Sequence, residues 1–443
     1  MLIVQTILFI VVTIGSFYIA FKKFKEIYDN VNLGKPEHIN STLGFRLKSM
    51  LLVAFGQKKM FKITFPAFLH LAIYVAFLIT QIELLEIIID GFTAGHRRIF
   101  HLIHNIPALK FIYKFTIGSI EAISLLTFFV TIIFILRRTI FKIARFNKPE
   151  MKGWPAKDAL LILAFELMLI CFIFMMNGAD RALQLQGNHH YIDTGGFVIS
   201  KYLGASMANL PSGLLVFMER VGWWGHYIMV LVFLNYLPYS KHLHIMLAFP
   251  NTFFTRPEPK GEMHNMPTIM NEVKAMFDDS FKVPEVEGEM QFGAKDVFDL
   301  SWKSLLDAYT CTECGRCTDA CPANQTGKKL SPRKIMMDTR DRMTEIAPAY
   351  KEQGAAFNDG KQLLGDYISK EELRACTTCN ACVEECPVNI SPLSIILELR
   401  RNMIMEEADA PAEWNAIFAN LENNQAPWQF SPADRLKWTE ELS

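Results

Sequence analysis

Eight of the nine cysteines lie in two motifs of the same spacing, CTECGRCTDACP and CTTCNACVEECP. Both match C-x₂-C-x₂-C-x₃-C-P, in which three close cysteines bind one [4Fe–4S] cluster and the fourth binds the neighbouring cluster. The spacing predicts one cluster on Cys311, Cys314, Cys317 and Cys386 and a second on Cys376, Cys379, Cys382 and Cys321. A pair of zinc sites is the alternative, although zinc knuckles usually supply two ligands per segment. Two clusters with exchanged ligands relay electrons, and the catalytic residues stay unknown.

Histidines in the apolar first half are the second group of candidate ligands, because ionisable side chains at membrane depth are costly and usually functional. His226 and His244 are 18 positions apart. On one helix that is five turns and roughly 27 Å, so both would lie on one face, with a kink at the proline between them. His70 shares the depth of His244, and this pair predicts an inner b-type haem. For His226 the candidate outer partners are His101 and His104, with His189 and His190 of the loop before the fifth span as alternatives. A hydrogen-bonded histidine without a ligand role is the alternative at each position.

The depth of these histidines follows from long apolar segments. A helix needs about 20 apolar residues to cross the hydrocarbon core of a membrane. Five segments qualify, at residues 2–21, 63–89, 115–136, 159–176 and 214–237. The first has its lysines after the apolar stretch and not before it, which indicates an uncleaved anchor and not a signal peptide. The sequence therefore predicts an all-α membrane bundle of five transmembrane helices.

The net charge of zero is an average over two unlike halves. Residues 1–250 contain 24 Lys and Arg against 13 Asp and Glu, whereas residues 251–443 contain 21 against 32. The basic residues of the first half gather in segments 22–62 and 137–157, which the positive-inside rule assigns to the cytoplasm. This predicts a multi-pass protein of the bacterial inner membrane, with the N-terminus outside and the cysteine motifs in the cytoplasm. In that reducing compartment clustered cysteines bind metals and do not form disulfides.

The same division predicts three regions. Residues 1–250 form the transmembrane cytochrome b domain, and residues 251–299 form a cytoplasmic linker. Residues 300–443 form a soluble, mostly α-helical, ferredoxin-like dicluster domain with a C-terminal tail that docks a partner.

Acidic and polar residues within the membrane half are candidates for a proton or quinone path. A solvated helix end is the alternative for those that follow the fourth span. The candidates are Glu83, Glu86, Glu121, Asn177, Asp180 and Arg181.

Residues 1–250 resemble the membrane cytochrome b subunit of respiratory nitrate reductase and its relatives in heterodisulfide reductases. The resemblance rests on the five spans, on the histidine spacing of the last one and on the string PYSKHLHI that closes it. That family carries two histidines on its second span, and His70 matches the inner one. The outer position falls near Thr80 and Gln81, where this sequence has no histidine.

Residues 300–440 are similar to the iron–sulfur part of heterodisulfide-reductase-like proteins, and their closing stretch NNQAPWQFSPADRLKWTEEL resembles the stretch that follows the second motif there. In that group the chain often continues into cysteine-rich CCG domains that form the catalytic part. The sequence up to Ser443 has no CCG motif, so the resemblance implies a separate CCG-domain subunit. Electron-transfer-flavoprotein:quinone oxidoreductases resemble this layout with the CCG part attached, which makes an electron-transfer flavoprotein a further expected partner.

Together these features predict a membrane-bound electron-transfer subunit of a quinone-linked oxidoreductase. Electrons would pass between a cytoplasmic redox partner, two [4Fe–4S] clusters, one or two b haems and a quinone, with menaquinone the expected type and quinone reduction the expected direction. The alternatives are a quinol-oxidising subunit of a heterodisulfide-reductase-like complex and a non-catalytic redox anchor. The sequence has no dinucleotide-binding loop, P-loop or nucleophile triad. The expected partners include membrane lipid and quinone but no nucleic acid.

Overall fold

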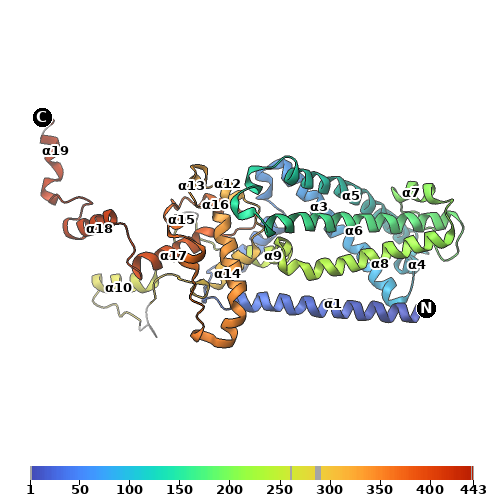
Figure 1. Cartoon of the computed structure of the whole chain (residues 1–443), viewed down its shortest axis with the longest axis horizontal. Helices are drawn as coiled ribbons and strands as arrows, with labels where there is room; N and C mark the ends of the chain where they lie inside the picture. Colours follow the sequence, from blue (N-terminus) through green and yellow to red (C-terminus); the bar gives the residue numbers. More distant parts are fainter. Residues whose placement is uncertain (1, 260–261, 285–290, 441, 443) are drawn as a thin grey trace.

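The structure, a computed structural model, describes residues 2–259, 262–284, 291–440 and 442. These residues form helices joined by turns, with no β-strand among them. Figure 1 shows an elongated molecule with a helical bundle at one end and the cysteine-bearing domain packed on the other. We call the end of the bundle that meets this domain the proximal end, and the opposite end, where the N-terminus lies, the distal end. The mostly helical prediction is confirmed.

Five long helices build the bundle, α1 (Leu2–Val31), α3 (Thr64–Thr93), α5 (Pro107–Thr139), α6 (Trp154–Leu185) and α8 (Ser212–Tyr236). By length and composition, α1, α3, α5 and α6 are able to cross a membrane. The described part of the chain offers no fifth helix of this kind, since α8 carries Glu219, Arg220 and His226, which reduce its apolar character. Four of the five predicted spans are thus supported by the structure, and the crossing of α8 stays a prediction.

Close packing nevertheless makes α8 a full member of the bundle. A Cβ atom on Gly222 would lie 2.6 Å from the backbone nitrogen of Met176, so α8 and α6 approach almost backbone to backbone. On its other side α8 meets α1, where the ring of Phe9 stacks on Tyr227 with centroids 4.5 Å apart. Phe9 is fully buried, although most apolar side chains of α1 are exposed, as expected for a surface that faces lipid.

The single long helix predicted to carry both His226 and His244 is not formed. α8 ends at Tyr236 and is followed by two 3₁₀ turns, Leu237–Tyr239 and Lys241–Leu243, before α9 (His244–Phe253) begins. Pro238 lacks the N–H that would continue the α-helical ladder. Ser240 then adopts an extended conformation (φ −119°, ψ 154°), and its side chain accepts a hydrogen bond from the backbone of His242. The proline therefore ends the helix and does not merely kink it.

Shorter helices connect the long ones and build the cysteine-bearing domain. In the membrane half these are α2 (Leu43–Ser49), the π-helical turn Met50–Phe55, α4 (Arg98–Ile103) and α7 (Ser200–Met207). In the second half they are α10 (Pro267–Phe277), α11 (Trp302–Thr310), α12 (Arg316–Asp319), α13 (Pro322–Gln325), α14 (Pro332–Gln353), α15 (Lys370–Arg374), α16 (Ala381–Glu385), α17 (Pro392–Met405), α18 (Ala412–Asn424) and α19 (Lys437–Glu440).

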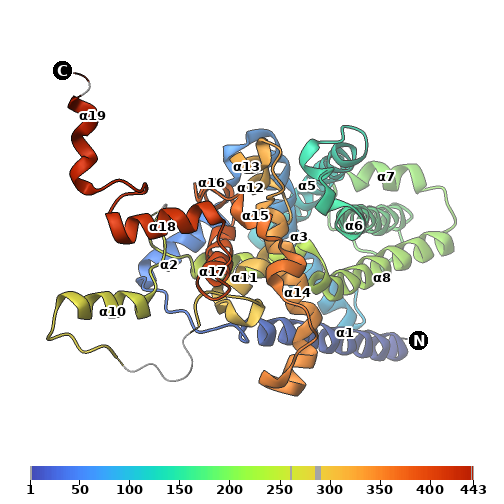
Figure 2. The ribbon, with the colours of Figure 1, turned by 60° about the vertical axis from the view of Figure 1, so that its left-hand side comes forward.

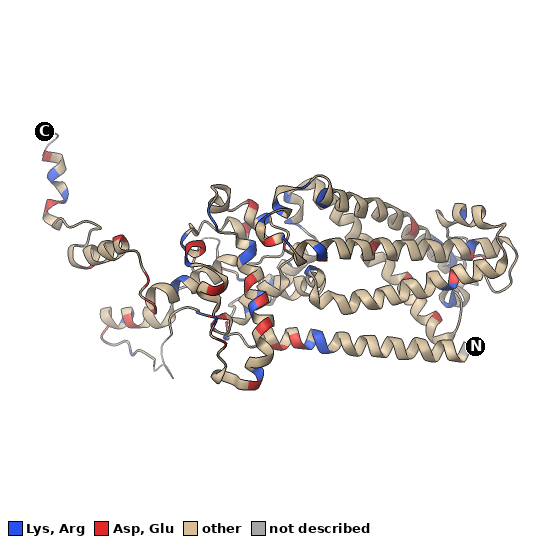
Figure 3. Cartoon of the chain, viewed as in Figure 1, with Lys and Arg blue, Asp and Glu red and all other residues tan. Residues whose placement is uncertain are grey.

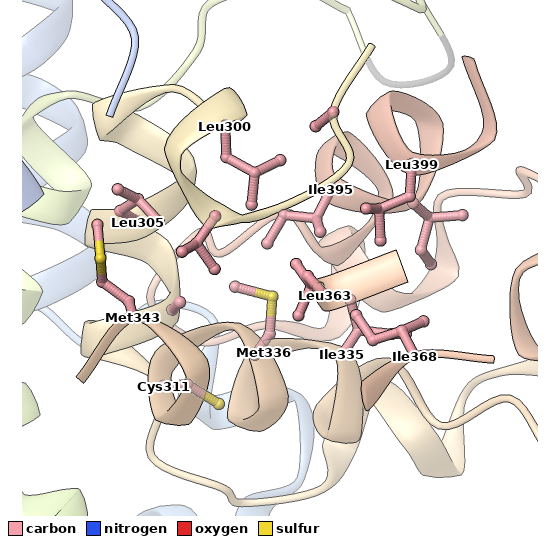
Figure 4. Packing of buried hydrophobic residues seen from close by; sticks show 14 of the residues in the cluster. Leu300, Leu305, Cys311, Ile335, Met336, Met343, Leu363, Ile368, Ile395 and Leu399 are labelled. Atoms are coloured by element: carbon pink, nitrogen blue, oxygen red, sulfur yellow. The ribbon is translucent and has the colours of Figure 1, made fainter. Parts of the chain in front are cut away.

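The cysteine-bearing domain has a continuous apolar core between α11, α14 and α17. Figure 4 shows Leu305, Met336 and Ile395 pointing toward one another from these three helices. Ile27 and Val31, at the proximal end of α1, belong to the same buried cluster. The domain is therefore packed onto the bundle by apolar contacts as well as by polar ones.

A similar helix start follows each cysteine motif. α14 begins after Ser331 and α17 after Ser391, and each serine side chain accepts a hydrogen bond from a backbone N–H of the first turn. A proline occupies the first helical position in both, where its fixed φ suits the helix and its missing N–H costs nothing. The two halves of the domain are thus built by a repeated local pattern that holds each cysteine motif against a rigid helix.

The predicted linker and tail extend from this core. Residues 285–290 of the predicted linker lie outside the described residues, and its described part contains α10. α18 and α19 follow α17 and reach away from the body of the molecule (Figure 2). Figure 3 shows charged residues, in blue and red, concentrated where the domain meets the bundle, whereas the middle of the bundle is largely uncharged. The domain boundaries themselves stay predictions.

Candidate iron–sulfur and haem sites

The first cysteine motif lines one partly open cavity. Its cysteines are Cys311, Cys314, Cys317 and Cys386. Apolar side chains and prolines supply most of the remaining wall, among them Met336, Val388 and Pro392. The fourth cysteine comes from the second motif, so this cavity gathers the four residues that the sequence assigns to one cluster.

The second motif lines another partly open cavity, whose cysteines are Cys376, Cys379, Cys382 and Cys321. Here the fourth cysteine comes from the first motif. Cys379 is exposed, whereas Cys321 and Cys382 are buried. The two cavities together bring all eight predicted ligands into two groups of four, with one cysteine exchanged in each direction.

Backbone conformation explains how each motif curls around its cavity. Glu313 and Gly315 in the first motif have positive φ angles of 54° and 76°, and Thr378 and Asn380 have angles of 55° and 60° at the matching positions of the second. Left-handed residues at alternate positions turn a short loop tightly enough to point three cysteines inward. Backbone N–H groups also point at sulfur, since Ile390 donates to Cys386 Sγ at 3.3 Å and Thr378 donates to Cys376 Sγ at 3.4 Å.

The donor set fits iron–sulfur clusters better than zinc. Burial raises the pKa of the Cys311, Cys382 and Cys386 thiols to about 12, so thiolates here need bound cations to form at neutral pH. Within the described residues, no group of three or more His, Cys, Asp or Glu side chains is arranged to hold a single metal ion. A zinc site requires its ligands about 2.3 Å from one ion. In a cubane each cysteine binds a different iron, so the sulfurs stand apart around a hollow.

Polar contacts fasten the first motif to the proximal end of the bundle. Arg316 donates hydrogen bonds to the carbonyl oxygens of Lys59 and Met60, each at 3.2 Å. Glu313 lies 2.7 Å from the Nζ atom of Lys241, and both side chains are buried. The cavity of the first motif therefore adjoins the membrane half, and the second motif also reaches it, since Lys62 pairs with Glu385 at 3.2 Å.

A second set of contacts comes from the loop between α5 and α6. Arg333, which lines the first cavity, donates to the carbonyl oxygen of Arg145 at 2.8 Å and pairs with Glu150 at 2.7 Å. Burial raises the pKa of Glu150, but the hydrogen bonds from Ser331 and Arg333 outweigh it, so the net pKa is lowered. The carboxylate is thus anionic at neutral pH and completes a buried ion pair between the two halves.

Three histidines gather beneath this contact at the proximal end. The ring of His242 lies 5.5 Å from that of His244, and His70 is within electrostatic range of both. His70 Nδ1 lies 3.2 Å from Gln57 Oε1, and His244 Nδ1 donates to the carbonyl oxygen of Lys241 at 2.9 Å. An anchored Nδ1 leaves Nε2 as the ligating atom, which is the usual arrangement for a metal-bound histidine. Burial lowers the pKa of His244, which keeps its imidazole in the neutral form that binds iron.

The outer haem site is less complete. His226 Nδ1 lies 3.1 Å from the carbonyl oxygen of Leu169, which again leaves Nε2 available. The resembled cytochrome b family carries its outer histidine near Thr80 and Gln81. In this structure both side chains hydrogen-bond to carbonyl groups of their own helix, α3. Near the distal end His104 contacts His101 and Phe100, and no contact among the described residues joins either histidine ring to His226. The structure therefore brings His70 and His244 together but leaves His226 without a second histidine among the described residues.

Sequence reasoning missed the residues that join these sites. Lys241, Arg316 and Glu313 carry the contact between the first motif and the bundle, and each is at least nine-tenths buried. The sequence does carry a signal for them, namely two charged residues inside a cysteine motif and one lysine close to a candidate haem ligand. Arg97 was also missed, although it pairs with three of the acids singled out as proton carriers or path residues.

Comparison with known proteins supports the iron–sulfur assignment. Residues 310–390 match the family described as the 4Fe-4S dicluster domain. The chain is 27% identical over 99% of its length to the probable iron-sulfur-binding oxidoreductase FadF of Bacillus subtilis. It is 26% identical over 97% of its length to the EtfAB:quinone oxidoreductase of Syntrophomonas wolfei. A shorter segment, 23% of the chain, is 35% identical to part of a CoB-CoM heterodisulfide reductase of Methanosarcina acetivorans, where it covers 49% of the matched polypeptide.

These matches have defined limits. The chain spans 61% of the Bacillus relative and 58% of the Syntrophomonas relative. No solved structure matches the chain. The prediction of a 4Fe–4S dicluster protein related to iron–sulfur oxidoreductases is confirmed, and its four apolar helices make it a membrane protein. The resemblance of the membrane half to the cytochrome b of nitrate reductase stays a prediction.

Proposed function

We propose that this chain carries electrons between a cytoplasmic redox partner and the membrane quinone pool, in the direction of quinone reduction. The observation that carries the proposal is the contact between the cavity of the first motif and the proximal end of the bundle, where His70 and His244 lie. A chain built only to anchor a ferredoxin would have no need of partly buried histidines at the junction with the cluster domain. The near full-length similarity to a protein named EtfAB:quinone oxidoreductase also favours a quinone as the membrane partner.

When bound, two [4Fe–4S] clusters and a b-type haem supply one-electron carriers. The eight cysteines of the two cavities hold the clusters, and His70 and His244 hold the haem through their Nε2 atoms. The exposed Cys379 marks the second-motif cavity as the side open to a partner. Arg316 and Lys241 keep the first-motif cavity against the bundle. The chain thus forms a path from an exposed cytoplasmic surface to the membrane.

Orientation and partners belong to the same proposal. The proximal loops carry most of the lysines and arginines of the membrane half, which favours a cytoplasmic proximal end, an outer N-terminus and a fifth crossing by α8 in a bacterial inner membrane. A CCG-type iron–sulfur protein and an electron-transfer flavoprotein are the partners we propose. Menaquinone is the proposed quinone.

One alternative direction has support. Matches to parts of heterodisulfide reductases cover about a quarter to a third of the chain, which keeps quinol oxidation toward a disulfide-reducing partner as a second candidate. The two directions differ in which donor reduces the cofactors. Addition of quinol to the oxidised protein, or of reduced flavoprotein followed by quinone, separates them by absorbance and EPR.

The experiment that tests the proposal is a haem assay on the purified full chain and on two variants. We expect a pyridine haemochrome assay to give one haem per chain, and His244→Ala to remove it because the imidazole is the ligand. His242→Ala is the matched control, since His242 lies beside His244 and its Nδ1 atom finds no hydrogen-bond partner among the described residues. A normal haem spectrum in His244→Ala, or the absence of haem from the intact wild-type protein, would overturn the proposal. Two haems per chain would instead assign the second to His226.

A further inference from the structure

A group of buried ionisable side chains lies inside the bundle toward its distal end, away from the cysteines. Arg97, which is 4% exposed, is at its centre. Its Nη1 atom lies 3.3 Å from Glu83 and 3.1 Å from Glu86, its Nε atom lies 3.5 Å from Asp180, and its Nη2 atom donates to Asn177 at 2.5 Å. Three carboxyl groups from α3 and α6 therefore share one guanidinium group.

The charges of this group do not balance. Besides Arg97, the cation in direct contact is His96, whose Nε2 atom lies 3.3 Å from Asp180. A fourth carboxyl group, Asp90, accepts hydrogen bonds from the backbone N–H groups of Arg97 and Arg98. Even with His96 protonated, carboxyl groups outnumber the cations that contact them. Buried charges without a partner are so unfavourable that such groups neutralise by binding protons.

Unpartnered atoms point to where the proton resides. Glu83 and Glu86 are three residues apart on one face of α3. Each has one carboxyl oxygen bonded, to Arg97 in both cases, with Tyr113 also donating to Glu86 at 2.6 Å. The other oxygen of each, Oε2 of Glu83 and Oε1 of Glu86, is buried and finds no hydrogen-bond partner among the described residues. An ionised carboxylate can only accept hydrogen bonds, whereas a protonated one can donate from the second oxygen to its neighbour.

Other ionisable groups surround the pair on every packed element. On α5, Glu121 has electrostatic contact with Glu83 and accepts hydrogen bonds from the backbone of α7. On α8, Glu219 is paired with Arg220 and accepts a hydrogen bond from Tyr191. None of these supplies a cation to Glu83 or Glu86, so the charge imbalance stands.

A line of side chains links the group to the surface. The ring of the buried His96 lies 5.8 Å from that of His190, which is exposed on the loop between α6 and α7. His96 Nδ1 is also unpartnered among the described residues and is available to accept or donate a proton. The contacts run from solvent inward through His190, His96 and Asp180, and Asp180 shares the Arg97 guanidinium group with the Glu83–Glu86 pair.

We propose that Glu83 and Glu86 hold at least one exchangeable proton between them at neutral pH and exchange it with the aqueous phase at the distal end through His96 and His190. Release leaves a carboxylate and one H⁺, with no change in oxidation state. In the use we infer, which rests on the proposed function, quinone takes up two electrons from the cofactors and two protons to become quinol, and this site supplies protons from the distal side.

Infrared spectroscopy of the cofactor-loaded full chain in lipid tests the bound proton without requiring turnover. At neutral pH we expect the C=O band of a protonated carboxyl group, shifted when H₂O is replaced by D₂O. The band should move in protein labelled with ¹³C-glutamate, and it should weaken or vanish in Glu83→Gln and Glu86→Gln. Asp193→Asn is the matched control, because Asp193 is an exposed acid of the distal loop that pairs with Arg181.

Two results would overturn the proposal. One is a wild-type spectrum at neutral pH without a D₂O-sensitive carboxyl band that responds to glutamate labelling. The other is a band of unchanged intensity in the folded double variant Glu83→Gln, Glu86→Gln. The wild-type and labelling results decide the question even where the double variant fails to fold. If quinone reduction fails while the band is present, the proton site stands and the proposed function falls.

Discussion

Replacement of Cys386 by alanine tests how the eight cysteines divide between two clusters. In sequence Cys386 belongs to the second motif, but in the structure it lines the cavity of the first, where it is 8% exposed. Each cavity has four cysteines, and each cysteine of a cubane binds its own iron. Loss of one buried ligand should therefore empty one cavity and leave the other intact. Iron would fall from about eight to about four atoms per chain, with sulfide falling in step.

Two further variants give the reference spectra. Cys314 belongs to the first cluster whether or not the motifs exchange their fourth cysteines, and Cys379 likewise belongs to the second. Cys314→Ala and Cys379→Ala therefore each remove a ligand from a known cluster. EPR spectra of the dithionite-reduced proteins then show which cluster each variant keeps. We expect the spectrum of Cys386→Ala to match that of Cys314→Ala, because the two side chains line the same cavity. By the same reasoning Cys321→Ala should match Cys379→Ala.

The opposite match would refute the exchange of ligands. If Cys386→Ala gives the spectrum of Cys379→Ala, each motif binds its own cluster, and the cavities do not report the ligand sets. Zinc in place of iron, with no cluster signal in any of the variants, would refute the iron–sulfur assignment of the cavities itself.

Two smaller predictions concern the packing of the two halves. Gly222→Ala should destabilise the bundle by about 1–3 kcal/mol, because the added Cβ would overlap the backbone of α6. Gly213→Ala is the control and should leave the stability unchanged, because the space around Gly213 is open. Thermal unfolding in detergent measures the stability of both variants. Glu150→Gln should cost about 3–5 kcal/mol at neutral pH by leaving the buried Arg333 without its anion. The pKa of Glu150 is lowered in the folded protein. The ion pair therefore stabilises the fold at pH values above the ordinary pKa of 4.5, and this stabilisation is lost as the pH falls through the pKa of the folded protein. The difference in the free energy of unfolding between Glu150→Gln and the wild type should therefore become smaller in acid. A difference that does not change with pH would contradict the ion pair of Glu150 with Arg333.

The local features of this protein could be predicted from its sequence because each depends on residues close together in the chain. The spacing of Cys311, Cys314 and Cys317 implies a loop that curls around a cluster, and apolar runs of sufficient length imply helices in a membrane. The structure has a loop whose cysteines line a cavity and four helices long and apolar enough to cross a membrane, together with the serine and proline that begin α14 and α17.

Features that depend on tertiary contact could not be predicted in the same way. A proline such as Pro238 can kink a helix or end it, and the choice here is set by Ser240, whose extended backbone and side-chain cap start a new turn. Arg97 contacts two residues 80 and 83 positions further along the chain, by a hydrogen bond to Asn177 and an ion pair with Asp180, and no local sequence pattern predicts these contacts. The assignment of α8 to the membrane is ambiguous for a related reason, since its Glu219 and His226 hydrogen-bond to Tyr191 and to the carbonyl oxygen of Leu169, partners that lie far away in the sequence.

The break after α8 is the part of the fold that ties the two candidate cofactor regions together. Lys241 lies in the turn between Ser240 and His244. Its Nζ atom binds Glu313 of the first cysteine motif at 2.7 Å, and its carbonyl oxygen accepts the hydrogen bond from His244 Nδ1 at 2.9 Å. In a continuous helix that carbonyl would point along the helix axis and accept the backbone N–H four residues on. By ending α8, the proline frees one residue to contact the cysteine motif with its side chain and a proposed haem ligand with its backbone. The same short turn therefore fixes both sides of the junction that electrons would cross.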